Sequence, residues 1–192
     1  MGAGNRFDSR VGDYSTLYFA TELETCFLET LARLRPAQGF RDVIGEEWRE
    51  LGFMEVGAVP ADWRAKRLAV RVELSSELPF VDVEHPDTIQ VLRHELADVL
   101  QECGLTDLDI GIIRGPDRRV TRAISQWTYD QTTETGADAL YGGVRYFSRQ
   151  ERNMECWAAF QDVPLRELER RPITLQMQAL RKVAKIYELM LH

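Results

Sequence analysis

Short apolar runs of strand length alternate along the chain with longer amphipathic stretches. The apolar runs predict strands at residues 16–20, 68–74, 80–83, 109–114, 142–148 and 156–160. The amphipathic stretches predict helices near residues 22–34, 41–51, 88–103, 119–133 and 174–191. The strands are short and irregularly spaced, which does not fit a regular strand–helix–strand repeat. The sequence therefore predicts an α+β fold with a mixed β-sheet core and flanking helices.

Turn-forming and capping residues predict where these elements begin and end. Thr21 stands in the N-cap position of the first helix, with Glu24 three residues later as in a capping box. Asp87 is expected to cap the 88–103 helix and Gly104 to end it. The 41–51 helix is expected to be followed by a loop through Pro60. The 68–74 strand is expected to bury one face, which is formed by Leu68, Val70, Val72 and Leu74.

Length and composition bound the type of protein. A chain of 192 residues suits one domain, so we expect residues 1–165 to form it and residues 166–192 to pack on it as a C-terminal amphipathic helix. A hydrophobic share of 44% is enough for a buried core. The net charge of −7 disfavours direct binding to nucleic acid, because phosphate contacts need clustered cations. Apolar runs of a few residues also fall short of the roughly 20 that span a bilayer.

The cysteines and the first residues indicate the compartment. Cys26, Cys103 and Cys156 are odd in number, far apart and without CxxC spacing, which is typical of free thiols in a reducing cytoplasm. The opening MGAGNRFDSRVG lacks the apolar core of a signal peptide. We therefore expect a cytoplasmic protein without a membrane partner.

The best-known cofactor and metal motifs are missing. The sequence contains neither GxGxxG nor GxxxxGK[ST]. In HELAD, residues 94–98, Asp98 stands where a zinc-protease helix needs a second histidine. Asp82, Glu84 and His85 are interpreted as the polar end of a strand. The charged stretch 114–122 mixes both signs and is interpreted as a solvated face. Because the metal-binding motifs are missing, no metal site is expected.

Two segments combine residues suited to chemistry. In the first, Arg6 approaches the 16–20 strand, Tyr18 lies in that strand, and Glu29 follows in the next helix. A carboxylate close to an apolar helix face is costly unless it is paired or points into a cleft. A cation, an aromatic ring and a carboxylate are therefore expected to meet in one pocket. The second segment is the glycine-led GVRYFSR, residues 143–149.

Together these segments resemble the RES-domain family. The resemblance rests on an Arg-Phe pair, on LYxA, on a glutamate eleven residues after the tyrosine, and on GVRYFS followed by an apolar stretch that ends in Phe; it covers roughly residues 5–162. The family is named for an Arg, a Glu and a Ser, which match Arg6, Glu29 and Ser148, with Tyr18 as a fourth position. The resemblance implies a fold similar to ADP-ribosyltransferase toxins and a RES-like NAD-binding catalytic domain over residues 1–165.

The resemblance further implies that NAD is a substrate and not a resident cofactor. The expected activity is a hydrolase or phosphorylase reaction at the nicotinamide–ribose bond, in a toxin held by a partner antitoxin protein. Such cleavage passes through an oxocarbenium-like centre, which a carboxylate at Glu29 can stabilise. Arg6 suits the pyrophosphate and Tyr18 suits stacking on the nicotinamide or ribose. The expected substrate-binding residues are Ser148, Arg145 and Tyr146.

Other interpretations stay open at this point. Each candidate has a structural alternative: a solvated Arg6, a core Tyr18, a helix-surface Glu29 or a turn Ser148. The same pocket would also serve ADP-ribosyl transfer to a protein. Only five residues precede Arg6, fewer than family members usually carry there, which leaves a RES-like interaction module without catalysis as a third function. The choice between water and phosphate as acceptor, and the formation of a homo-oligomer, are also open.

Overall fold

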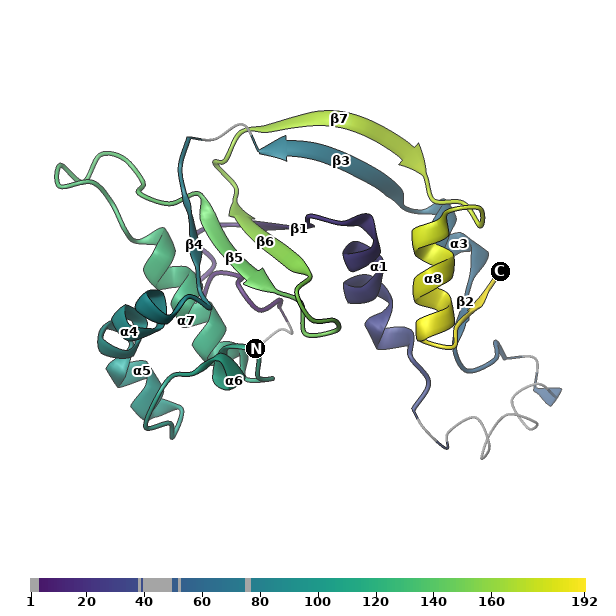
Figure 1. Cartoon of the computed structure of the whole chain (residues 1–192), viewed down its shortest axis with the longest axis horizontal. Coiled ribbons are helices and arrows are strands. Elements are labelled where there is room, and N and C mark those ends of the chain that lie inside the picture. The colour runs from purple at the N-terminus through teal and green to yellow at the C-terminus, as the bar shows by residue number, and fades with distance from the viewer. Residues whose placement is uncertain (1–3, 38, 40–49, 52, 75–76) are drawn as a thin grey trace. The chain divides into compact units, whose positions relative to one another are not determined.

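A computed structural model describes residues 4–37, 39, 50–51, 53–74 and 77–192 (Figure 1). The chain divides into two compact units: Met1–Thr21 with Leu74–Arg166, and Glu22–Glu73 with Glu167–His192. Both helices and a mixed sheet are present, so the predicted α+β class is confirmed. Among the described residues, no helix combines the length and apolarity needed to cross a bilayer. The helix predicted near 41–51 falls largely outside the described residues.

The first unit is built on a four-stranded sheet in the order β1-β6-β5-β4. Its strands are β1 Thr16–Ala20, β4 Phe80–Asp82, β5 Gly143–Phe147 and β6 Glu155–Phe160. β6 pairs antiparallel with both β1 and β5, whereas β4 runs parallel to β5. The alternation of side chains along β5 and β6 sends Val144, Tyr146, Cys156 and Ala158 into the core, where they are almost fully buried.

Four helices of the first unit supply the other side of this core. They are α4 Pro86–Glu95, α5 Ala97–Glu102, α6 Ile110–Ile113 and α7 Arg118–Tyr129. α7 packs against β5, and its Val120, Ala123 and Ile124 are buried in the same core. Three of the helices begin at a side chain that accepts a backbone N–H, which satisfies an orphan donor of the first turn. These N-caps are His85, Asp109 and Asp117.

α7 also anchors the N-terminal segment. The Ser125 hydroxyl donates to the Phe7 carbonyl at 2.7 Å and accepts from the Tyr14 hydroxyl at 2.7 Å. Arg122 donates to the Asn5 carbonyl at 3.2 Å. The Phe7 side chain is fully buried. Residues on both sides of Arg6 are therefore fixed to the same helix.

The second unit has its own core around α1 Leu23–Leu31 and α8 Gln178–Ile186. The Tyr187 hydroxyl donates to the Leu28 carbonyl at 3.1 Å, and Lys182 pairs with Glu24 at 2.8 Å. The other elements among the described residues are η1 Ala32–Leu34, β2 Ala58–Val59, α3 Ala61–Ala65, β3 Leu68–Leu74, β7 Leu165–Pro172 and β8 Met190–Leu191. β2 pairs with β8, and β3 pairs with β7. The expectation that residues 166–192 pack on one domain with residues 1–165 stays a prediction.

The strand predicted at 109–114 is wrong, because these residues form helix α6. The Asp109 side chain accepts from the Ile112 N–H at 2.7 Å, which starts a helical turn. Of the three isoleucines in this turn, only Ile113 is fully buried. The local cap therefore prevails over the β-propensity of the DIGII run.

Several predicted boundaries also differ. Glu22, not Thr21, is the N-cap of α1, since the Thr21 hydroxyl donates to Glu155 at 3.1 Å. His85 replaces Asp87 as the cap of α4, and Leu96 separates α4 from α5. Gly104 ends α5 with a φ of 73°, as predicted.

The loop and strand predictions differ as well. The loop expected through Pro60 contains β2 and leads into α3. In β3, Leu68 and Val70 are exposed, and β7 was not predicted at all.

Candidate functional site

Tyr18 is the polar centre of the N-terminal part of the site. It lies in β1 opposite Ala158, and its hydroxyl accepts from the Phe7 N–H at 2.9 Å and donates to Asp8 at 2.8 Å. Burial, followed by the hydrogen bond to Asp8, raises the pKa of the Tyr18 phenol well above its ordinary value. Tyr18 is therefore a neutral phenol at physiological pH, suited to stacking or to hydrogen bonding and not to proton abstraction.

Replacing Tyr18 by phenylalanine is expected to lower the free energy of unfolding by about 1–3 kcal/mol, because it leaves the Phe7 N–H without its acceptor. Urea denaturation followed by tryptophan fluorescence measures this change. Tyr129→Phe is the matched control, since among the described residues the Tyr129 hydroxyl makes no hydrogen bond. Equal stability of the two variants would contradict the structural role given to the Tyr18 hydroxyl.

Arg6 lies beside the same cluster. Its guanidinium carbon is 5.2 Å from the ring centre of Phe7 and 5.0 Å from that of Tyr146, both within cation–π range. Its Nη2 donates to the Ile113 carbonyl at 2.7 Å. The Phe7 and Tyr146 rings are 4.7 Å apart. Three of the predicted residues, Arg6, Tyr18 and Tyr146, are thus gathered around Phe7.

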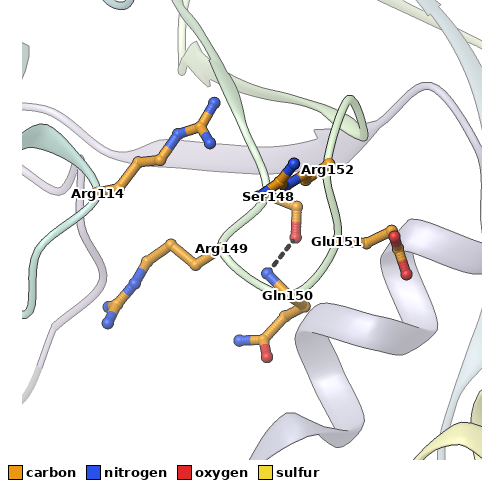
Figure 2. Close-up of a pocket in the computed structure, with 6 residues that line it drawn as sticks. All are labelled: Arg114, Ser148, Arg149, Gln150, Glu151 and Arg152. Carbon is orange, nitrogen blue, oxygen red and sulfur yellow. Dashed lines mark hydrogen bonds between the residues drawn. The ribbon is translucent and has the colours of Figure 1, made fainter. Parts of the chain in front are cut away.

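Ser148 lies at the end of β5, at a hollow of about 380 Å³. It is 2% exposed, and its hydroxyl accepts from the Gln150 N–H at 3.0 Å, as the dashed line in Figure 2 shows. The hollow is lined by Arg114, Ser148, Arg149, Gln150, Glu151 and Arg152. Three guanidinium groups against one carboxylate make this hollow cationic in an acidic chain.

A buried carboxylate ties this hollow to the Arg6 cluster. Glu84 is 8% exposed and accepts from the Arg114 Nε at 3.0 Å and from the Phe147 N–H at 3.0 Å. Arg114 directly follows Ile113, whose carbonyl binds Arg6. Contacts therefore run without a gap from Arg6 through Glu84 to the backbone next to Ser148.

Arg145 makes a separate set of contacts. It pairs with Asp82 at 2.7 Å and with Glu155, and its guanidinium lies 4.2 Å from the ring centre of Phe147. The hydrogen bond from Arg145 is the main reason that the pKa of Glu155 is lowered. Arg145 does not line the hollow, so its assignment to substrate binding stays a prediction without support from these contacts.

Glu29 belongs to the second unit. It is exposed near the C-terminal end of α1, where its neighbour Leu28 is fully buried. Its placement beside Tyr18, which lies in the first unit, stays a prediction.

Six residues of the site were not predicted as site residues from the sequence, namely Glu84, Arg114, Arg149, Gln150, Glu151 and Arg152. Arg114 is no part of a solvated face, because it pairs with a buried carboxylate. One feature of the sequence could have indicated an anion-binding site here: two arginines lie within the four residues after the candidate serine. Among the described residues, no cluster of three or more His, Cys, Asp or Glu is placed to hold a metal ion.

The family model of the RES domain matches residues 1–179. The chain belongs to the RES domain family. This match confirms the family that the Arg6, Tyr18, Glu29 and Ser148 pattern indicated. Searches of curated proteins and of solved structures each find no match to this RES-domain chain, so likeness to an ADP-ribosyltransferase stays a prediction.

Proposed function

We propose that this RES-domain protein cleaves NAD at the bond between nicotinamide and ribose. The observation that carries the proposal is the cationic hollow at Ser148, a family-matching residue, joined by contacts to Arg6. A dinucleotide carries a pyrophosphate, and guanidinium groups bind phosphate oxygens through paired N–H donors. In a chain of net charge −7, such a concentration of cations favours a specific anionic ligand over general attraction to polyanions.

The proposed mechanism assigns the bond cleavage to electrostatic stabilisation. As the nicotinamide leaves with the electron pair of the bond, positive charge develops on the ribose, and the Glu29 carboxylate stabilises it. The neutral Tyr18 phenol stacks on the ring or ribose, and Arg6 and Ser148 hold the remaining polar groups. Water as acceptor gives ADP-ribose, and phosphate as acceptor gives the sugar 1-phosphate of ADP-ribose.

Incubation of the purified chain with NAD, with and without inorganic phosphate, tests this proposal. Release of nicotinamide in both tubes supports hydrolysis, and release only with phosphate supports phosphorolysis. Intact NAD in both tubes, with a folded protein by circular dichroism, would overturn it. With radiolabelled NAD, a labelled protein band in place of free ADP-ribose would establish transfer to a protein.

A cell that loses its NAD stops growing, so the proposed activity suits the toxin of a toxin–antitoxin pair. Induced expression should then lower cellular NAD before growth arrests. Growth arrest at an unchanged NAD level would contradict this role.

A further inference from the structure

The Glu84–Arg114 ion pair is part of the contacts that join the hollow to Arg6, but the proposed mechanism gives neither residue a role. The Glu84 side chain is 5% exposed and that of Arg114 is 34% exposed, so the carboxylate is buried while part of the guanidinium faces solvent. Burying the carboxylate has a desolvation cost that offsets its attraction to Arg114, so the pair is weak evidence for a stabilising role. Its geometry therefore calls for another explanation.

One carboxylate here fixes two parts of the hollow. Oε2 of Glu84 accepts from Arg114, and Oε1 accepts from the N–H of Phe147, the residue directly before Ser148. The guanidinium of Arg114 also lies 5.6 Å from the ring centre of Phe147. The buried Glu84 carboxylate thus fixes the positions of both Arg114 and the backbone next to Ser148.

Arg114 keeps donors available for a ligand. Its Nε and Nη2 bind Glu84, and among the described residues its Nη1 makes no hydrogen bond. Figure 2 shows Arg114 and Arg149 on one side of the hollow and Ser148 at its wall. Within the part of the chain that the structure describes, neither Arg149 nor Arg152 forms an ion pair. The unbalanced charge of this hollow is therefore positive.

We propose that Arg114 binds a phosphate group of the ligand in this hollow and that Glu84 is its positioning residue. This inference rests on the proposed function, of which it names the phosphate-binding side. A guanidinium already fixed by a buried carboxylate loses little conformational freedom when it binds, which favours affinity. The phosphate belongs either to the pyrophosphate of the dinucleotide or to a free inorganic phosphate that acts as acceptor.

Titration calorimetry with three probes tests the role of Arg114: ADP-ribose, inorganic phosphate, and nicotinamide riboside, which carries no phosphate. Arg114→Gln is expected to weaken binding of a phosphate-bearing probe roughly 10- to 100-fold, as the loss of a charge-assisted hydrogen bond does. Binding of nicotinamide riboside should be unchanged. A loss for ADP-ribose assigns the hollow to the pyrophosphate, and a loss for inorganic phosphate alone assigns it to the acceptor.

Arg119→Gln is the matched control, because Arg119 pairs with Asp117 and does not line the hollow. If Arg114→Gln fails to fold because it leaves the buried Glu84 carboxylate unpaired, the double variant Glu84→Gln/Arg114→Gln replaces it, since that variant removes both charges of the pair. If the double variant binds both phosphate-bearing probes as tightly as Arg119→Gln does, or if the wild-type chain binds neither probe, the inference is overturned.

The positioning role of Glu84 predicts that its effect depends on Arg114. Glu84→Gln alone should weaken phosphate binding several-fold, whereas adding it to Arg114→Gln should weaken it no further. A purely structural glutamate would weaken binding equally in both backgrounds, which would contradict positioning through Arg114. Urea unfolding of the same variants separates lost stability from lost affinity.

The inference and the proposed function can fail separately. If NAD is cleaved but the Arg114 variants bind every probe like wild type, the inference fails and the proposed function stands. If NAD stays intact while inorganic phosphate or ADP-ribose binds in an Arg114-dependent way, the proposed function fails and the phosphate site stands.

Discussion

Replacement of Gly143 by alanine is expected to lower the free energy of unfolding of the first unit by about 3 kcal/mol or more. Gly143 opens β5, where it pairs with Ala159 of β6, and its φ is 151°, which a residue with a Cβ rarely adopts. An added Cβ would lie 2.1 Å from the Ala158 carbonyl oxygen and 2.8 Å from the Phe80 ring. Neither the paired backbone nor the ring packed on Trp157 can yield without disturbing the sheet.

Urea denaturation of wild type and variant measures this loss. Gly136→Ala is the control that separates backbone strain from collision, since Gly136 has a φ of 70° but no atom within 4 Å of an added Cβ. Its cost should stay near 1–2 kcal/mol, that of the left-handed backbone alone. An equal loss in both variants would show that the contact with Ala158 is not what requires glycine at 143.

The four strands of the first unit could be predicted because each is a compact apolar run in the sequence. In β5 the buried Val144 and Tyr146 alternate with the less buried Arg145 and Phe147, so a period of two is visible, whereas β6 is marked by the unbroken apolar run 156–160. β7 carries no such pattern. Its sequence LRELERRP is charged, and all of its residues are exposed on a two-stranded ribbon. β7 forms because its backbone pairs with β3. Since no side chain of β7 is buried, its sequence shows no hydrophobic pattern that would predict a strand.

From the sequence, only those residues of the site that lie in short motifs could be predicted. Arg6, Tyr18 and Ser148 stand in recognisable patterns, and contacts in the first unit connect all three. Glu84 and Arg114 are 30 residues apart, and each belongs to an ordinary charged stretch. Only the tertiary fold reveals that the carboxylate is buried and that it holds the arginine. Glu29 belongs to the second unit, so its role depends on an experiment.

Replacement of Glu29 by glutamine is expected to slow the proposed NAD cleavage roughly 10²- to 10³-fold, the usual loss when one electrostatic group of a transition state is removed. Glutamine keeps the shape and hydrogen-bonding reach of the side chain but cannot offer a negative charge to the developing oxocarbenium. The effect should therefore fall on kcat, with KM for NAD little changed. Because Glu29 is exposed on α1, stability should change by less than about 0.5 kcal/mol.

Glu22→Gln is the matched control on the same helix, since Glu22 is the exposed N-cap of α1 and makes no side-chain capping bond. It removes the same charge from the same element seven residues away, so general electrostatic effects on a dinucleotide should appear equally in both variants. A steady-state assay of nicotinamide release then decides between them. If Glu29→Gln turns over NAD as fast as Glu22→Gln does, the charge that stabilises the ribose cation must come from another carboxylate. If only Glu29→Gln is slow while both bind NAD equally, Glu29 acts on the transition state itself.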